Sequence, residues 1–252
     1  MRIYFLFFLL FLSVASFGQE LPTDRILIEK VYGKCDSESE SFTRKHNEDE
    51  FQHPYYENIS YRIKHKEIIS LNDKELLLLV TEAPFIYQHG HVLGYMDIHY
   101  LQRNENDWKL INSIISEAPL GDDSNYEIVN IGINKLALTS NFQSSGNRYF
   151  EKTISFYYLQ PSESKLLLEI TLEYDNRISK QPDSETAECE AEKHQSSFEI
   201  IESENEWFNI KEKQTHYVFS VGCENETVES EFELLYSYES GRYIEKQKVK
   251  TK

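Results

Sequence analysis

Hydrophobic and polar positions alternate along most of the chain or form short apolar runs, a pattern typical of β-strands. Turn residues divide these stretches into pairs, and each pair is predicted to form an antiparallel hairpin. The predicted hairpins join 61–71 with 74–83, 94–102 with 108–116, 126–133 with 135–142, 152–160 with 165–174, 206–212 with 216–223, and 231–239 with 242–249.

The hairpins group into units of four strands, over 61–116, 126–174 and 206–249. The third strands of the first two units end alike, in HYLQ at 99–102 and YYLQ at 157–160. Such units in series resemble the blades of β-propellers, although closed propellers usually carry about four to eight blades. We therefore predict an all-β antiparallel fold in which three consecutive four-stranded units form an open propeller-like stack or a two-layer sandwich.

The N-terminal residues have the pattern of a secretory signal peptide. A short positively charged start precedes the apolar run Ile3–Leu12, and the small residues Ser16 and Gly18 suit a cleavage site before Gln19. The pattern predicts a signal peptide over 1–18, a periplasmic or extracellular location, and no membrane insertion after the signal is removed.

The remaining chain divides into two parts. Residues 19–60 are predicted as an N-terminal edge segment and polar loop, in which 22–32 forms an edge strand or a short helix. Residues 61–252 are predicted as the repeated antiparallel β domain. Two long polar loops are expected, at 36–58 and at 179–197.

The charge of the chain narrows the choice of partners. Its formal net charge is −17, and Asp183–Glu206 holds nine carboxylates and one lysine. This charge repels phosphate backbones, so nucleic acid is excluded as a partner, whereas a basic protein or peptide would be attracted. The candidate binding residues in this region are Glu188, Glu190, Glu192, Glu202, Glu204 and Glu206.

Three cysteines are present, at positions 35, 189 and 223. An exported protein can form disulfides, and an odd number leaves one thiol free or paired with another chain. We predict a Cys189–Cys223 disulfide because both cysteines fall in the last third of the chain.

The stretch 85–101 carries a candidate metal site. Imidazoles and a carboxylate are the ligand set of many zinc and iron sites, and a folded loop could bring them together. The alternative interpretation is a hairpin turn followed by a strand that faces solvent. The four candidate ligands are His89, His91, Asp97 and His99.

A strand over 94–102 would separate these side chains by face. Met96, Ile98 and Tyr100 would point into the core, and Asp97 and His99 would lie on the opposite, solvent-facing side.

A second candidate metal site lies at 121–127, where Asp123, Asn125 and Glu127 alternate as oxygen ligands do in calcium loops. The usual glycine after the third ligand is absent, and a plain interstrand turn explains the same residues. No cofactor is therefore predicted as required, with calcium and zinc as the alternatives.

Recognisable catalytic motifs are missing: the sequence contains no GxSxG, HExxH or phosphate-binding glycine loop. We therefore predict a non-catalytic binding protein, such as an inhibitor or immunity-type protein directed against a cationic protein. The first alternative is a metal-dependent hydrolase or metal-binding module that uses the 85–101 histidines. The second is a glycan-binding module that uses some of the 17 tyrosines.

Overall fold

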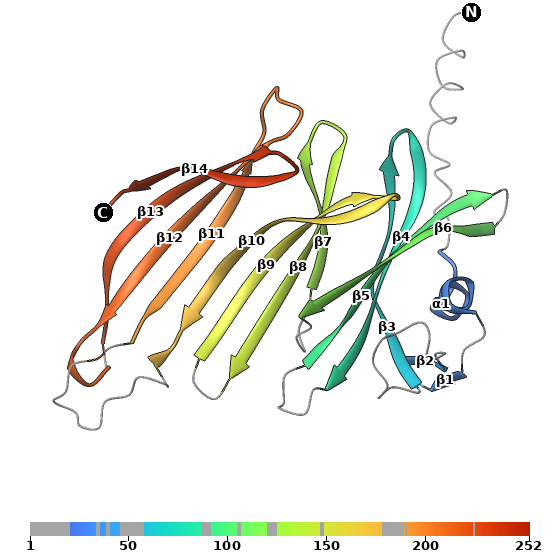
Figure 1. Ribbon diagram of the computed structural model, residues 1–252, viewed down its shortest axis with the longest axis horizontal. Helices are drawn as coiled ribbons and strands as arrows, with labels where there is room; N and C mark the ends of the chain where they lie inside the picture. The colour runs from blue at the N-terminus through green and yellow to red at the C-terminus, as the bar shows by residue number, and fades with distance from the viewer. Residues whose placement is uncertain are drawn as a thin grey trace, which may run out of the picture.

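The computed structural model describes residues 21–33, 36–38, 41–45, 58–86, 92–104, 107–119, 125–146, 149–177, 189, 191–223 and 225–252. Within these ranges the chain forms the helix α1 (Asp24–Tyr32), a short 3₁₀ turn (Val221–Cys223) and fourteen β-strands (Figure 1). The strands are β1 Asp36–Glu38, β2 Ser41–Lys45, β3 Asn58–Leu71, β4 Lys74–Ile86, β5 Val92–Asn104, β6 Asp107–Pro119, β7 Asn125–Gly132, β8 Lys135–Gly146, β9 Tyr149–Gln160, β10 Glu163–Asp175, β11 Lys193–Ile201, β12 Asn209–Phe219, β13 Glu226–Glu239 and β14 Arg242–Lys250.

The strands form two antiparallel sheets, which confirms the predicted all-β fold. The first sheet has the order β1-β2-β3-β4-β5-β6, and the second has the order β14-β13-β12-β11-β10-β9-β8-β7. The four long strands of the first sheet, β3 to β6, are the first predicted unit. The second and third units are joined in one sheet, because β10 pairs with β11 over Glu173–Asp175.

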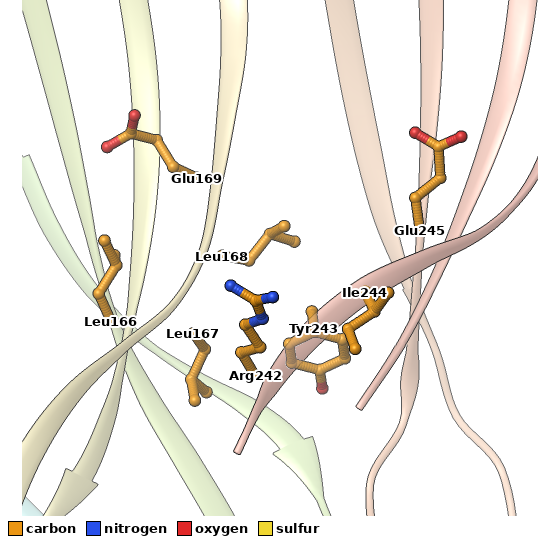
Figure 2. A pocket seen from close by; sticks show the side chains of 8 residues that line it. All are labelled: Leu166, Leu167, Leu168, Glu169, Arg242, Tyr243, Ile244 and Glu245. Atoms are coloured by element: carbon orange, nitrogen blue, oxygen red, sulfur yellow. The ribbon is translucent and has the colours of Figure 1, made fainter. Parts of the chain in front are cut away.

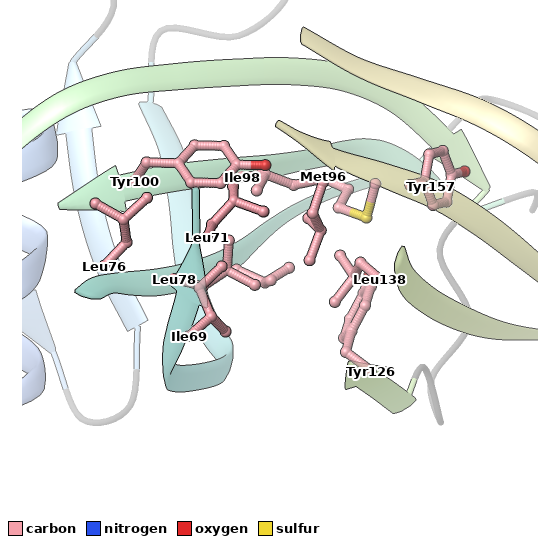
Figure 3. Close-up of a cluster of buried hydrophobic side chains, with 12 residues drawn as sticks. Ile69, Leu71, Leu76, Leu78, Met96, Ile98, Tyr100, Tyr126, Leu138 and Tyr157 are labelled. Carbon is pink, nitrogen blue, oxygen red and sulfur yellow. The ribbon is translucent and has the colours of Figure 1, made fainter. Parts of the chain in front are cut away.

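The main core lies between the two sheets (Figure 3). One face of β3, β4 and β5 meets side chains from the first strands of the second sheet, including Tyr126, Leu138 and Leu159. The predicted core residues Met96, Ile98 and Tyr100 all lie in this cluster and are fully buried. Alternation along β5 therefore identified correctly which side chains face the core between the two sheets.

The opposite face of the first sheet is also buried, since α1 covers it. Leu27 of α1 packs against Leu77 and Leu79 of β4 and against Leu101 and Trp108. Every residue from Leu76 to Ala83 is consequently buried, and the unbroken apolar run in β4 fits a strand with a core on each side.

The segment 22–32 is thus a helix, which is one of its two predicted forms. Its apolar residues recur at helical spacing, and Leu27 and Ile28 are its buried positions. Among the described helices, none is long and apolar enough to cross a membrane.

The second sheet has its own core on the face turned away from the first sheet. Phe156 and Tyr158 of β9 point into this second core, whereas Tyr157 and Leu159 point into the core between the sheets. Thr153 to Leu159 are therefore all buried, and β9 is a central strand shared by two cores.

Three predicted boundaries are wrong. The polar loop at 36–58 contains β1 and β2, and the polar loop at 179–197 ends in β11, which begins at Lys193. The turn predicted at 213–215 does not exist, because β12 runs through it while pairing with β11 along its length. The segment Lys213–Thr215 lacks glycine, asparagine and proline, so nothing forces the strand to reverse there.

The connector between β11 and β12 crosses to the far edge of the second sheet. The Ile133 amide donates to the Glu206 carbonyl over 2.9 Å, and the Phe208 amide donates to the Ile131 carbonyl over 2.9 Å. Gly132 faces Trp207 in an antiparallel bridge. These bonds fasten the connector to β7, which is otherwise paired only with β8 among the described strands.

Replacing Gly132 with alanine is expected to destabilise the protein by about 1–3 kcal/mol, the usual cost of forced overpacking. A Cβ atom on Gly132 would stand 2.2 Å from the Glu206 carbonyl oxygen, which is backbone and cannot swing aside. Urea unfolding measures the effect, with Ile133→Ala as the control, since Ile133 is 51 % exposed. Equal stability of G132A and wild type would show that the connector does not lie this close to β7.

Candidate functional site

The connector presents the predicted acidic residues at one end of the second sheet. Glu202, Glu204 and Glu206 are all exposed. Glu192 is exposed as well, but it precedes β11 and so lies at the other end of that strand, about 30 Å away at 3.3 Å per residue. Glu188 and Glu190 lie outside the described residues. The structure thus brings together three of the six predicted side chains.

An aromatic pair adjoins the end of this acidic run, since Trp207 directly follows Glu206 in the connector. The rings of Trp207 and Tyr238 stack with centroids 3.6 Å apart and an interplanar angle of 8°. The ring of Tyr158 lies 5.0 Å from Trp207. We call Glu202, Glu204, Glu206, Trp207 and Tyr238 the acidic–aromatic surface.

The acidic–aromatic surface already holds a cation from the chain itself. The Lys135 ammonium lies 2.9 Å from Glu206 Oε1 and 5.3 Å from the centre of the Trp207 ring. Its hydrogen bond to Glu206 raises the pKa of Lys135 above its ordinary value. A carboxylate and an indole face therefore act together on one ammonium group, which is the chemistry that recognises lysine and arginine side chains.

The glycan alternative rests on exposed tyrosines, and Trp207 adds little to it. Tyr238 covers one face of the indole, and Lys135 lies over the ring as well. A sugar ring needs a free aromatic face to stack on, and Trp207 offers little of one.

A groove of about 430 Å³ adjoins the acidic–aromatic surface and lies between β10 and β14 (Figure 2). Tyr243 connects the two features, because it lines the groove and its ring lies 5.8 Å from Tyr238. In Figure 2, Leu168 projects from β10 toward β14. The groove is lined by Leu166, Leu167, Leu168, Glu169, Arg242, Tyr243, Ile244 and Glu245.

The predicted disulfide is present. Cys189 and Cys223 are bonded, with their Cα atoms 5.2 Å apart. The bond ties the connection between β10 and β11 to the turn that follows β12. Cys35 lies outside the described residues.

Two of the four predicted metal ligands are buried, contrary to the prediction of a solvent-facing strand. Asp97 is 2 % exposed and His99 is 1 % exposed, because α1 covers this face of the first sheet. His89 and His91 lie outside the described residues. In the part of the chain that the structure describes, no three His, Cys, Asp or Glu side chains are grouped as metal ligands.

The buried pair belongs to a hydrogen-bonded chain centred on Tyr32 of α1. The Tyr32 hydroxyl donates to Asp97 Oδ2 over 2.6 Å and lies 2.9 Å from His99 Nε2. On the other side of the imidazole, His99 Nδ1 lies 2.8 Å from Ser113 Oγ. Because the single Tyr32 proton goes to Asp97, we infer that His99 Nε2–H donates to Tyr32 and that Ser113 donates to Nδ1.

Burial shifts the pKa values of both groups toward their neutral forms. It raises the pKa of Asp97 to about 6, partly offset by the hydrogen bond from Tyr32, and lowers the pKa of His99 to about 3. The second carboxylate oxygen of Asp97 has no hydrogen-bond partner within the described part of the chain. We therefore interpret this buried polar chain as the attachment of α1 to the first sheet.

The calcium candidate at 121–127 is described only in part. Asp123 lies outside the described residues, while Asn125 and Glu127 are exposed residues of β7.

Comparison with known proteins gives no guide to function: no family model, no curated protein and no solved structure matches the chain. The described part of the chain is therefore characterised by its own fold, two antiparallel sheets with a helix covering one of them, and by the acidic–aromatic surface. Sequence reasoning missed Lys135 of β8, Trp207 of the connector and Tyr238 of β13, which meet only through long-range contacts. The one local signal was a tryptophan directly after the acidic run.

Proposed function

We propose that the protein is a non-catalytic binding protein, acting in the periplasm or outside the cell, for a basic protein or peptide. The observation that carries the proposal is the Lys135 ammonium held between Glu206 and Trp207, beside two further exposed carboxylates. A partner's lysine or arginine would meet the same chemistry. An inhibitor or immunity-type role against a secreted cationic protein fits such a surface.

The parts of this surface would contribute in different ways. Exposed carboxylates each add little energy, about 0–1 kcal/mol, but they speed the approach of a cationic partner and orient it. Burial of apolar area adds affinity, and Ile133, which is 51 % exposed beside the connector, supplies such area. The net charge of −17 extends the attraction beyond direct contact.

The proposal predicts salt-sensitive binding of a cationic probe at this surface. Nona-arginine is expected to bind wild-type protein at 50 mM salt and to lose most of its affinity at 300 mM, because exposed charges are screened. The triple variant Glu202→Gln, Glu204→Gln, Glu206→Gln is expected to bind about tenfold more weakly, as three weak ion pairs are lost. Isothermal titration calorimetry measures both effects.

The matched control removes the same charge elsewhere. Glu75, Glu127 and Glu229 are exposed residues of β4, β7 and β13, and their triple change to glutamine should leave the affinity within about twofold. Equal losses of affinity in the two triple variants would show that the net charge of the protein, and not this surface, accounts for the binding. Binding that ignores salt, or no binding at all, would contradict the proposed function.

A further inference from the structure

The second sheet is split along part of its length. Strand β10 pairs with β9 from Glu163 to Asp175, but it pairs with β11 only over Glu173–Asp175. Strand β11 pairs with β12 along its whole length, 193–201. Figure 1 shows β10 and β11 close at one end and diverging toward the other. Among the described residues, the outer edge of β10 from Glu163 to Leu172 therefore has no strand partner.

An edge of this kind is a template for another strand. Roughly every second residue of an edge strand points its N–H and C=O groups outward, where an added strand can bond to them. Natural edges are usually blocked by proline, a bulge or inward charge, or are kept short. Along β10 the register with β9 shifts twice, at Leu167 and at Leu172, while the run Leu168–Thr171 between the two bulges pairs regularly with β9. Leu166, beside the first bulge, is 46 % exposed.

The groove between β10 and β14 runs beside this edge. Leu168 and Ile244 give it apolar walls that would accept alternate side chains of an extended segment. Glu169 and Glu245 stand on opposite sides of it in Figure 2, and Arg242 is the one basic residue among those that line it. The groove thus favours apolar side chains flanked by basic ones.

We propose that an extended segment of the cationic partner adds as a strand to the outer edge of β10, with apolar side chains against Leu168 and Ile244. The proposal rests on the proposed function for the charge of the partner, and it adds the mode of recognition. Main-chain bonds to β10 supply affinity, and the groove selects the side chains. Basic residues of the same partner reach the acidic–aromatic surface, which adjoins the groove through Tyr243.

The test compares two peptides that differ only in their ability to pair as strands. The probe is Arg-Val-Thr-Val-Lys-Val-Thr-Val-Arg, and its counterpart carries N-methyl groups on the central Val-Lys-Val amides, which blocks both edges at equal charge. The unmethylated peptide is expected to bind at least about tenfold more tightly in calorimetry. Hydrogen exchange should show new protection of the outward-pointing amides within Glu163–Leu172 in its complex, about every second one.

A groove variant and its control locate the site. Ile244→Arg places a charge in the groove and should weaken binding of the unmethylated peptide about tenfold, with nona-arginine binding little changed. Val249→Arg adds the same charge on the same strand at a position that is 41 % exposed, and it should leave peptide binding unchanged.

The outcomes separate this inference from the proposed function. Equal, salt-sensitive binding of both peptides would overturn strand addition and leave the proposed function standing. Failure of both peptides and of nona-arginine at low salt would overturn both. A dimer seen by light scattering without peptide, and abolished by Ile244→Arg, would assign the edge to a second copy of the chain and overturn the partner proposed here.

Discussion

Replacing His99 with glutamine is expected to give a variant whose stability relative to wild type, compared at the same pH, increases as the pH falls from 6 to 4. In the folded protein His99 stays neutral down to a pKa of about 3, whereas in the unfolded chain it takes up a proton near pH 6.5. The unfolded state therefore binds the extra proton between these limits, and the contribution of His99 to wild-type stability falls by about 1.4 kcal/mol per pH unit on acidification. A glutamine removes this loss, which totals about 5 kcal/mol near pH 3.

Asp97 has the opposite effect. Its pKa is raised to about 6 in the folded protein, so the folded state binds the extra proton between pH 6 and the ordinary value of 3.8. The stability that Asp97 contributes through this proton is fully present below pH 3.8 and is lost as the pH rises through 6. The difference amounts to about 3 kcal/mol. The two contributions nearly cancel between pH 4 and 6 in wild type, and each single variant should reveal the other.

Urea unfolding of wild type, His99→Gln and Asp97→Asn at pH 4, 5, 6 and 7 measures these slopes. The stability difference between His99→Gln and wild type should change by about 1.4 kcal/mol per pH unit in favour of the variant as the pH falls. Asp97→Asn should change in the opposite direction, which makes it the control for other titrating groups. Differences that do not vary with pH would show that these side chains are hydrated rather than buried beneath α1.

Removal of the Cys189–Cys223 disulfide is expected to cost about 4 kcal/mol of stability. The bond joins residues 34 apart in the sequence, and closing a loop of that size restricts the unfolded chain by about this amount in the chain-entropy model. The double variant Cys189→Ser, Cys223→Ser tests the contribution without leaving a reactive thiol at either position.

Chemical denaturation of oxidised protein, reduced protein and the double variant measures this cost. Reduced wild type and the double variant should agree with each other, since both lack the same covalent constraint. Cys35→Ser is the control and should leave the stability of the oxidised protein unchanged, because the observed bond does not use Cys35. A reduced protein as stable as the oxidised one would contradict the prediction.

The sequence predicted those parts of the fold that depend on local alternation and turn chemistry. Asn72 and Asp73 adopt positive φ values of 52° and 59° in the turn predicted between β3 and β4. The start of strand β11 was missed because its first five residues, 193–197, are polar on both faces, and its apolar residues Phe198 and Ile200 come only near its end. Its inward-facing Ser196 is satisfied by a bond of 2.7 Å to Glu212, a partner that no local pattern indicates.

Local sequence patterns also failed to predict the long-range contacts of the candidate site. The acidic residues could be found from composition, whereas their aromatic neighbours could not. The burial of Asp97 depends on Tyr32, 65 residues earlier, so a strand that reads as half-exposed by itself becomes fully covered. A pattern of period two reports which side chains share a face, but it does not report what covers that face.

The fastening of the β11–β12 connector to β7 has a consequence for how the chain folds. Strands in each sheet follow one another in sequence, so hairpins can zip together one after another with little loop entropy to overcome. The Tyr243 hydroxyl, in contrast, reaches the Ile131 carbonyl across 112 residues. We therefore expect the contacts of β7 with the β11–β12 connector and with Tyr243 to form last and to limit the rate of folding. The same edge of the second sheet should be the first part of the molecule to open in local unfolding.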